Sequence, residues 1–304
     1  QRQYRMNRPT ARAILTSSRV PFLAVTLVCI FLGAVCCTAQ GVRLSIPLLA
    51  LALLNALVAH ASVNLLNEYL DFKSGIDLHT QRTPFSGGSG GLPAHPEMAG
   101  TVLWAGLLCF VLTAAFGLYF VALRGPLLLV PGLMGLSLIA GYTRWINRMP
   151  WLCLIAPGLG LGLVMVFGTH LALGGKPSPP VFLSAGILFA LGNNLLLLNQ
   201  YPDISADLAA GRRHFPIAYG IGASNAAYGL FVFAAAAMLV YGTHGAYLPK
   251  TALLALVPLS LSLFALRGML RLRGNIGSLP MYMAANVAAA LLTPLALGLA
   301  ISFG

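Results

Sequence analysis

The feature that most constrains this chain is a series of apolar runs, separated by short polar segments. A helix needs about 20 apolar residues to cross the hydrocarbon core of a bilayer. Only 8% of the residues are charged, whereas soluble domains carry roughly 25%. Because no run alternates as a barrel strand does, the runs predict spanning helices. We expect about nine spans, at residues 21–39, 44–66, 99–122, 126–143, 151–173, 181–201, 217–242, 250–266 and 279–302.

The predicted fold class is therefore an all-α, polytopic membrane protein that forms a single domain over residues 1–304. Residues 1–20 are basic and carry interspersed apolar side chains, which predicts a segment lying at the membrane interface, and a disordered basic tail is the alternative for its first few residues. The five cysteines are scattered through apolar runs without a C-x-x-C spacing, so we expect small buried side chains rather than metal ligands.

The basic residues predict how the spans are oriented. If the N-terminus is cytoplasmic, 14 of the 18 Lys and Arg residues fall on the cytoplasmic side, and the other four are Arg43, Arg124, Lys176 and Lys250. This asymmetry follows the positive-inside rule, and the membrane would be the inner membrane in a bacterium. Topology and anionic lipid headgroups account for the net charge of +12, so no nucleic-acid partner is expected.

The six acidic residues are concentrated in two stretches. N-E-Y-L-D-F-K-S-G-I-D (67–77) and N-Q-Y-P-D-I-S-A-D (199–207) hold five of them. Residues 65–71 and 197–203 are identical at five of seven positions, which indicates a duplicated element. Each stretch follows a span that ends on the cytoplasmic side, so the repeat is predicted to be parallel. Carboxylates at a membrane edge are costly, and this predicts a functional site.

The spacing of the acidic residues predicts which of them share a helical face. Asn67 and Asp71 are four residues apart, and Asn199, Asp203 and Asp207 repeat that spacing, so each set is expected on one face.

Asp77 lies six residues beyond Asp71, on the wrong face of a continuous helix. The intervening Lys73-Ser74-Gly75 predicts a glycine-capped helix end that turns the chain back. The Gly-rich run at residues 86–91 could present N–H groups to a phosphate or close as a lid, although a flexible linker has the same composition.

Converging aspartates would repel one another unless cations lay among them. Oxygen-rich sites without Cys or His suit Mg²⁺, which commonly bridges carboxylates to substrate phosphates. The surrounding helices are apolar, so we predict a ligand with a diphosphate head and a hydrocarbon tail. Basic residues that could neutralise phosphate oxygens are Lys73, Arg82, Arg144, Arg148 and Arg212. The pair Arg144 and Arg148 fits plain topology charge equally well.

The two motifs and the nine spans resemble the UbiA superfamily of intramembrane prenyltransferases, over essentially the whole chain. The stretch at 67–77 is most similar to the branch that contains the dihydroxynaphthoate prenyltransferases of menaquinone synthesis, where the last Asp also lies six residues beyond the middle one. R-T-P-F-S-G-G-S-G (82–90) is similar to the same branch. The resemblance implies a UbiA-like bundle whose active-site loops are residues 67–98 and 199–216.

The resemblance also implies the reaction. A polyprenyl group would pass from a polyprenyl diphosphate to a small aromatic quinone precursor, with release of pyrophosphate. The implied Mg²⁺ ligands are Asp71, Asp77, Asp203 and Asp207. Asn67 would act beside them, and Asn199 would contact the diphosphate. Tyr69, Tyr142 and Tyr201 could line the allylic cation, and packing is the alternative role for them.

One residue departs from the family pattern. The family commonly has Asp directly after the first Asn, and here that residue is Glu68, either a metal ligand or a group behind the ligands.

Other functions stay open. The same fold could act on a non-aromatic acceptor or cyclise the isoprenoid. A cation-coupled transporter fits less well, because transporter sites usually lie near the bilayer midplane and these motifs lie at one face.

Overall fold

The computed structural model describes residues 14–76, 83–84 and 88–304. In this part of the chain, seven helices are long and apolar enough to cross a membrane, and two shorter apolar helices, Ala24–Thr38 and Pro126–Gly141, lie among them. The seven are Ile46–Ser74, Pro96–Arg124, Pro150–Ala172, Pro179–Asn199, Phe215–His244, Lys250–Leu272 and Pro280–Phe303. The predicted all-α membrane class is confirmed. The interfacial segment predicted at 1–20 falls largely outside the described residues.

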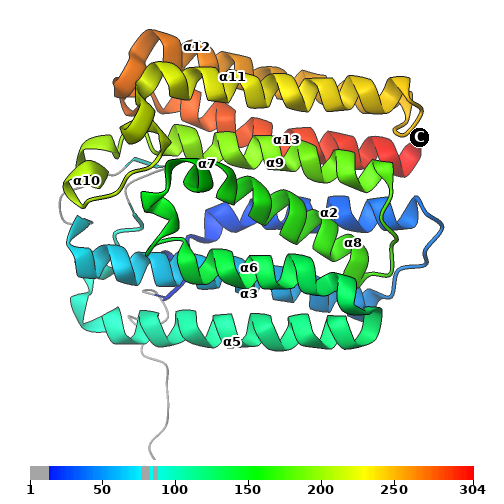
Figure 1. Cartoon of the computed structure of the whole chain (residues 1–304), viewed down its shortest axis with the longest axis horizontal. Coiled ribbons are helices and arrows are strands. Elements are labelled where there is room, and N and C mark those ends of the chain that lie inside the picture. Colours follow the sequence, from blue (N-terminus) through cyan, green and yellow to red (C-terminus); the bar gives the residue numbers. More distant parts are fainter. Residues whose placement is uncertain (1–13, 77–82, 85–87) are drawn as a thin grey trace, which may run out of the picture.

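The long helices lie side by side along one direction (Figure 1). Their α-helical parts are α2 (Ala24–Thr38), α3 (Ile46–Ser74), α5 (Ala99–Arg124), α6 (Leu129–Gly141), α7 (Pro150–Gly158), α8 (Gly168–Ala172), α9 (Pro179–Asn199), α11 (Phe215–His244), α12 (Leu256–Leu272) and α13 (Pro280–Phe303). Two short helices, α4 (Gly91–Ala94) and α10 (Ile204–Ala209), belong to the loops at one end. The remaining short turns are η1 (Val20–Leu23), η3 (Pro96–Met98), η4 (Pro126–Leu128), η5 (Ile146–Arg148), η7 (Lys250–Ala255) and η8 (Arg273–Ser278).

Proline and glycine define several helix ends. Proline occupies the first turn of α3, α7, α9, α11 and α13, where its missing N–H has no helical partner to lose and its fixed φ suits the helix. At the other end of α3, Gly75 has a φ of 77° in the left-handed region, which glycine enters without steric cost. The predicted glycine cap after Ser74 is therefore confirmed.

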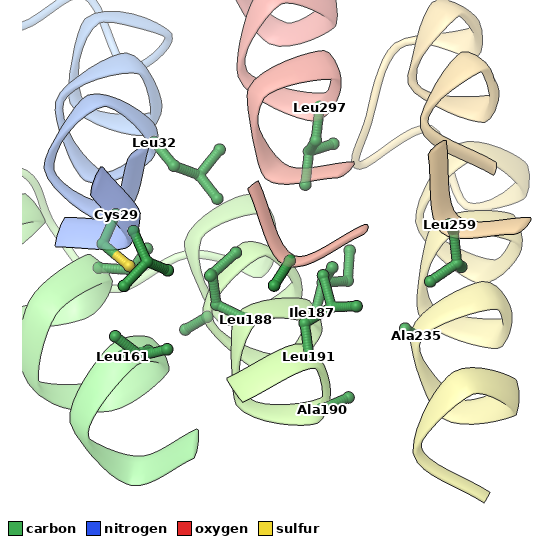
Figure 2. Packing of buried hydrophobic residues seen from close by; sticks show 14 of the residues in the cluster. Cys29, Leu32, Leu161, Ile187, Leu188, Ala190, Leu191, Ala235, Leu259 and Leu297 are labelled. Carbon is green, nitrogen blue, oxygen red and sulfur yellow. The ribbon is translucent and has the colours of Figure 1, made fainter. Parts of the chain in front are cut away.

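Helix α9 forms the centre of the bundle. Of its apolar window, 67% is buried, whereas only 11% of the window of α3 is. It packs against α7, α11 and α13. Figure 2 shows Ile187, Leu188 and Leu191 of α9 among side chains from neighbouring helices, including Leu161 and Leu297.

A distorted segment packs closely on α9. Pro157 lies inside α7, and the chain continues as a π-helix, η6 (Leu159–Phe167). The N–H of Gly158 donates to Asn193 Oδ1 at 2.7 Å. A Cβ atom at Gly162 would collide with the carbonyl oxygen of Ala185. The lack of a side chain therefore allows the two helix backbones to approach, and Asn193 joins the two helices through its hydrogen bond.

The two helices that carry the acidic motifs run in the same direction and finish at the same end of the bundle, where α10 lies (Figure 1). This is the parallel arrangement that the repeated stretch predicts.

Candidate active site

A cavity of about 330 Å³ opens where α3 and α9 end. Polar and charged side chains from both motifs line one part of it, and apolar side chains of α6, η6 and α9 line the rest. The polar lining includes Arg19, His60, Asn64, Asn67, Asp71, Tyr142, Asn147, Asn199, Gln200, Asp203, Asp207, Arg212 and His214. The structure thus brings three of the four predicted aspartates to one cavity, and Asp77 lies outside the described residues.

An ion-pair cluster joins the two halves of the protein. Arg212 donates from Nη2 to Asp71 Oδ1 and from Nη1 to Asp207 Oδ1, the latter at 2.8 Å. His214 Nε2 lies 2.9 Å from Asp207 Oδ2. Burial opposes the charge of Arg212, but the two carboxylates outweigh it and raise the pKa of the guanidinium. Since Asp71 and Asp207 are both buried, Arg212 supplies the positive charge that they require.

The second motif does not lie on one helical face, which corrects the prediction from its four-residue spacing. Helix α9 ends at Asn199, a turn follows, and α10 begins at Ile204 with Asp203 at its N-cap. Pro202 lies in that turn, where its ring and missing N–H disfavour a continuous helix. Asn199, Asp203 and Asp207 still line the same cavity, although α9 and α10 are separate helices.

The loop between α6 and α7 closes another side of the cavity. Thr143 Oγ1 donates to Asn67 Oδ1 at 2.7 Å. Asn147 is buried, donates from Nδ2 to the carbonyl of Thr143 at 2.7 Å, and accepts from the N–H of Arg213 at 3.0 Å. Burial raises the pKa of Tyr142 well above its usual value, so this cavity-lining phenol is neutral. The loop therefore contacts both motif segments.

Five predicted residues lie outside the cavity lining. Lys73, Arg144 and Arg148 are exposed. The Lys73 ammonium lies 5.9 Å from the ring centre of Tyr69, which packs on the outer side of α3 near Leu65. Tyr201 is buried in the main core, and its hydroxyl donates to Asn225 Oδ1 at 2.7 Å. Packing, the alternative role, describes both tyrosines. Arg82 lies outside the described residues.

Several cavity residues were not found as site residues from the sequence. Arg19, Asn147 and His214 do not belong to a motif that can be recognised in the sequence. Each has other polar residues close to it along the chain, so none of them stands out. His60 also lines the cavity, and its Nδ1 lies 2.7 Å from Thr26 Oγ1 on α2, which makes it a helix contact.

The donor atoms at the cavity mouth suit a hard cation. Three aspartates and Asn199 line the cavity there, and Asn199 Oδ1 is buried without a hydrogen-bond partner among the described residues. Oxygen ligands of this kind are those that Mg²⁺ prefers. In the part of the chain that the structure describes, no three Asp, Glu, His or Cys side chains are close enough to hold an ion as they stand. Arg212 lies between Asp71 and Asp207 instead.

A second cavity of about 230 Å³ adjoins the first. The two share Ala59, Gly135, Ile139, Val164 and Met165. Most of its lining is aliphatic and comes from α3, α5, α6 and η6. The two cavities therefore lie next to each other, and the first carries the charged side chains whereas the second is largely apolar.

Solved structures share this fold at low sequence identity. A digeranylgeranylglyceryl phosphate synthase is 14% identical with a TM-score of 0.68, over 96% of this chain and 99% of its own. A UbiA homologue from Archaeoglobus fulgidus, bound to DMAPP and Mg²⁺, is 15% identical with a TM-score of 0.66, over 95% and 98%. The apo UbiA homologue from Aeropyrum pernix K1 is 15% identical with a TM-score of 0.62, over 89% and 96%.

Comparison with curated protein sequences gave no match. The family model described as the UbiA prenyltransferase family matches residues 26–287, a range that contains both motifs. The predicted superfamily is confirmed, whereas the menaquinone branch stays a prediction. Because the family model covers most of the chain and the fold agrees along its length, this protein belongs to the UbiA prenyltransferase family and is a prenyltransferase enzyme.

Proposed function

We propose that the enzyme transfers a polyprenyl group from a polyprenyl diphosphate to a small aromatic quinone precursor, with Mg²⁺, and releases pyrophosphate. The observation that carries this proposal is the cavity that Asp71, Asp203 and Asp207 line at one end and apolar side chains line at the other, with a second, apolar cavity next to it. Its shape and chemistry suit a diphosphate head with a hydrocarbon tail. The Archaeoglobus fulgidus homologue bound to GPP and Mg²⁺ supports the same ligand class.

The charged end would bind the diphosphate. Asp71, Asp203 and Asp207, with Asp77 and the amide oxygen of Asn199, would hold Mg²⁺, which neutralises the diphosphate and stabilises pyrophosphate as it leaves. Arg212 already lies between two of these carboxylates. Its guanidinium would donate to diphosphate oxygens when substrate is bound, and the two carboxylates would then be available to hold Mg²⁺.

The apolar end would hold the prenyl tail. The apolar lining would keep water from the allylic carbon, which lies where the tail joins the diphosphate, so the C–O bond could break without capture of the cation by water. Tyr142 lines the cavity near the aspartates, and its ring can stabilise the allylic cation through a cation–π contact. A carbon of the aromatic acceptor then forms the new C–C bond, and loss of the proton on that carbon restores aromaticity.

The motif end of the bundle would face the cytoplasm. The positive-inside asymmetry supports this orientation. Trp145 and Trp151 are exposed at this end, where indole rings favour the lipid headgroup region, and Arg148 and Arg213 are exposed beside them.

The test is Mg²⁺-dependent pyrophosphate release in detergent or nanodiscs from polyprenyl diphosphates of several lengths. Candidate acceptors would be dihydroxynaphthoate, other aromatic quinone precursors and glycerol phosphates. Release that requires both Mg²⁺ and an aromatic acceptor would support the proposal, and dihydroxynaphthoate as the best acceptor would support the menaquinone branch.

A non-aromatic acceptor is the second candidate, because the fold also matches a digeranylgeranylglyceryl phosphate synthase. Release that requires a glycerol phosphate would favour it. Release without any acceptor would instead indicate cyclisation or hydrolysis of the donor.

A further inference from the structure

Arg19 lies at the charged end of the cavity and has no role in the scheme above. Its side chain is only 25% exposed, and its charge acts on the nearby Asp71 carboxylate. The Nε atom is buried and has no hydrogen-bond partner among the described residues. Arg19 thus lines the same cavity as the aspartates and has a guanidinium donor without a protein partner among the described residues.

The backbone of Arg19 is held in an unfavourable conformation. Its φ of 51° lies in the left-handed region, which residues with a Cβ atom rarely enter. Such conformations persist only where the surrounding contacts impose them, and they concentrate at functional sites. One contact is the carbonyl of Ser18, which accepts from Asn64 Nδ2 of α3 at 2.9 Å.

The other contact is Glu68, one turn beyond Asn64 on the same face of α3. Glu68 is fully buried, and its Oε2 atom lies 3.4 Å from Arg19 Nη2. The same carboxylate accepts from the backbone N–H of Ser89 at 3.2 Å and from the Ser89 hydroxyl. The N–H of Gly91 donates in turn to Ser89 Oγ at 3.0 Å. Glu68 therefore joins α3 to the segment that precedes α2 and to the segment after Gly88.

We propose that Arg19 is a further diphosphate-binding residue and that Glu68 is the positioning residue that holds it, together with the Ser89 segment, at the cavity mouth. The inference rests on the proposed function. A guanidinium can bind phosphate oxygens through several N–H groups at once, and Glu68 engages only one edge of Arg19. The buried glutamate offsets the charge that the arginine would otherwise bring unpaired into the protein.

The sequence left open whether Glu68 is a metal ligand or a group behind the ligands, and its hydrogen bonds favour the second role. A carboxylate that already accepts from Arg19 and Ser89 lies behind the cavity surface, and it is absent from the cavity lining described above. The extra methylene relative to Asp lets the carboxylate reach both partners. We therefore place Glu68 behind the metal ligands and not among them.

The experiment measures two quantities on Arg19→Gln, Arg19→Lys, Glu68→Gln and Glu68→Asp. The first is the change in KM for the polyprenyl diphosphate, compared with the change in kcat. The second is the shift in melting temperature caused by Mg²⁺ with inorganic pyrophosphate. Arg43→Gln is the matched control, because Arg43 is exposed at the other end of the bundle. We expect Arg19→Gln to raise KM at least about tenfold and to reduce the pyrophosphate shift, with partial rescue by lysine.

The positioning role is tested by the double variant Arg19→Gln/Glu68→Gln. If Glu68 acts through Arg19, the change in KM of the double variant is smaller than the sum of the two single changes. Additive changes would overturn the positioning role. An Arg19→Gln variant that behaves like Arg43→Gln in both measurements would overturn the role of Arg19. If the wild type releases no pyrophosphate from any donor, the proposed function fails, while the pyrophosphate shift still tests Arg19.

Discussion

The ends of α3 and α9 carry nearly the same seven residues but lie in different surroundings. In the apolar window of α9, 67% of the residues are buried, against 11% for α3. Both ends deliver an aspartate to one cavity. The residues between have different partners, because α9 passes through the core and α3 lies at the side of the bundle. The sequence repeat therefore places an aspartate from each half at the same cavity, but the surroundings of the two halves differ.

The position after the repeated asparagine shows the difference most clearly. Glu68 on α3 faces Arg19 and Ser89, which compensate its buried charge. Gln200, its counterpart, faces Cys153, and its Nε2 atom lies 3.3 Å from Cys153 Sγ. A carboxylate there would have no cation of its own, since Arg212 already pairs with Asp71 and Asp207. Buried charge is kept where a partner is present.

The largest expected effect tests whether the two halves share one site. Asp71→Asn and Asp203→Asn should each lower kcat/KM by about 10³-fold or more, because each removes a charge that binds the metal and the diphosphate. Mg²⁺-dependent pyrophosphate release measures the loss. Glu97→Gln is the control, since Glu97 is exposed outside both motifs. A loss of activity in only one of the two variants would contradict a shared site, because such a site needs both aspartates.

The next effect compares glycines on central and peripheral helices. Gly162→Ala should lower the free energy of unfolding by about 1–3 kcal/mol, since its methyl group would meet the backbone oxygen of Ala185 on α9. Gly117→Ala on α5 should cause no loss, because the added atom meets nothing within 4 Å. Thermal unfolding in one detergent measures both variants. Equal losses would show that α5 is packed as tightly as α9.

The tyrosines of the repeat should differ by a smaller amount. Tyr201→Phe leaves the buried Asn225 Oδ1 without its 2.7 Å hydrogen bond and should cost about 1–2 kcal/mol of stability. Tyr69→Phe keeps the ring that contacts Lys73 and should cost less. Melting temperatures give the order, and residual pyrophosphate release shows whether either tyrosine also serves the reaction. A larger drop in release for Tyr201→Phe than its stability explains would return that residue to the site.

The smallest effect concerns Gln200. Gln200→Met keeps the length of the side chain and removes only the weak contact with Cys153, so the free energy of unfolding should change by about 0.5 kcal/mol. Urea or thermal unfolding in detergent measures this difference against the wild type. A loss as large as that of Tyr201→Phe would show that the amide has a further partner, such as bound substrate.

Much of the fold could be predicted because its cause is local. A bilayer requires apolar runs of fixed length, and all nine predicted runs coincide with apolar helices in the described residues. The cap at Gly75 also followed from residue type alone. The break at Pro202 was missed, because the four-residue spacing predicted one helical face, whereas the proline disfavours a continuous helix and decided the backbone.

The order of the residues is enough to predict the membrane class, the parallel placement of two acidic stretches and the oxygen-only chemistry that suits Mg²⁺. These depend on composition and on positions along single helices. Which charges face one another depends on how the helices pack. Arg212 reaches Asp71 across 141 residues, and Arg19 reaches Glu68 across 49. Such pairs form only when helix packing brings distant segments together, so neither motif spacing nor charge counting could distinguish Arg212 and Arg19 from the exposed Arg144 and Arg148.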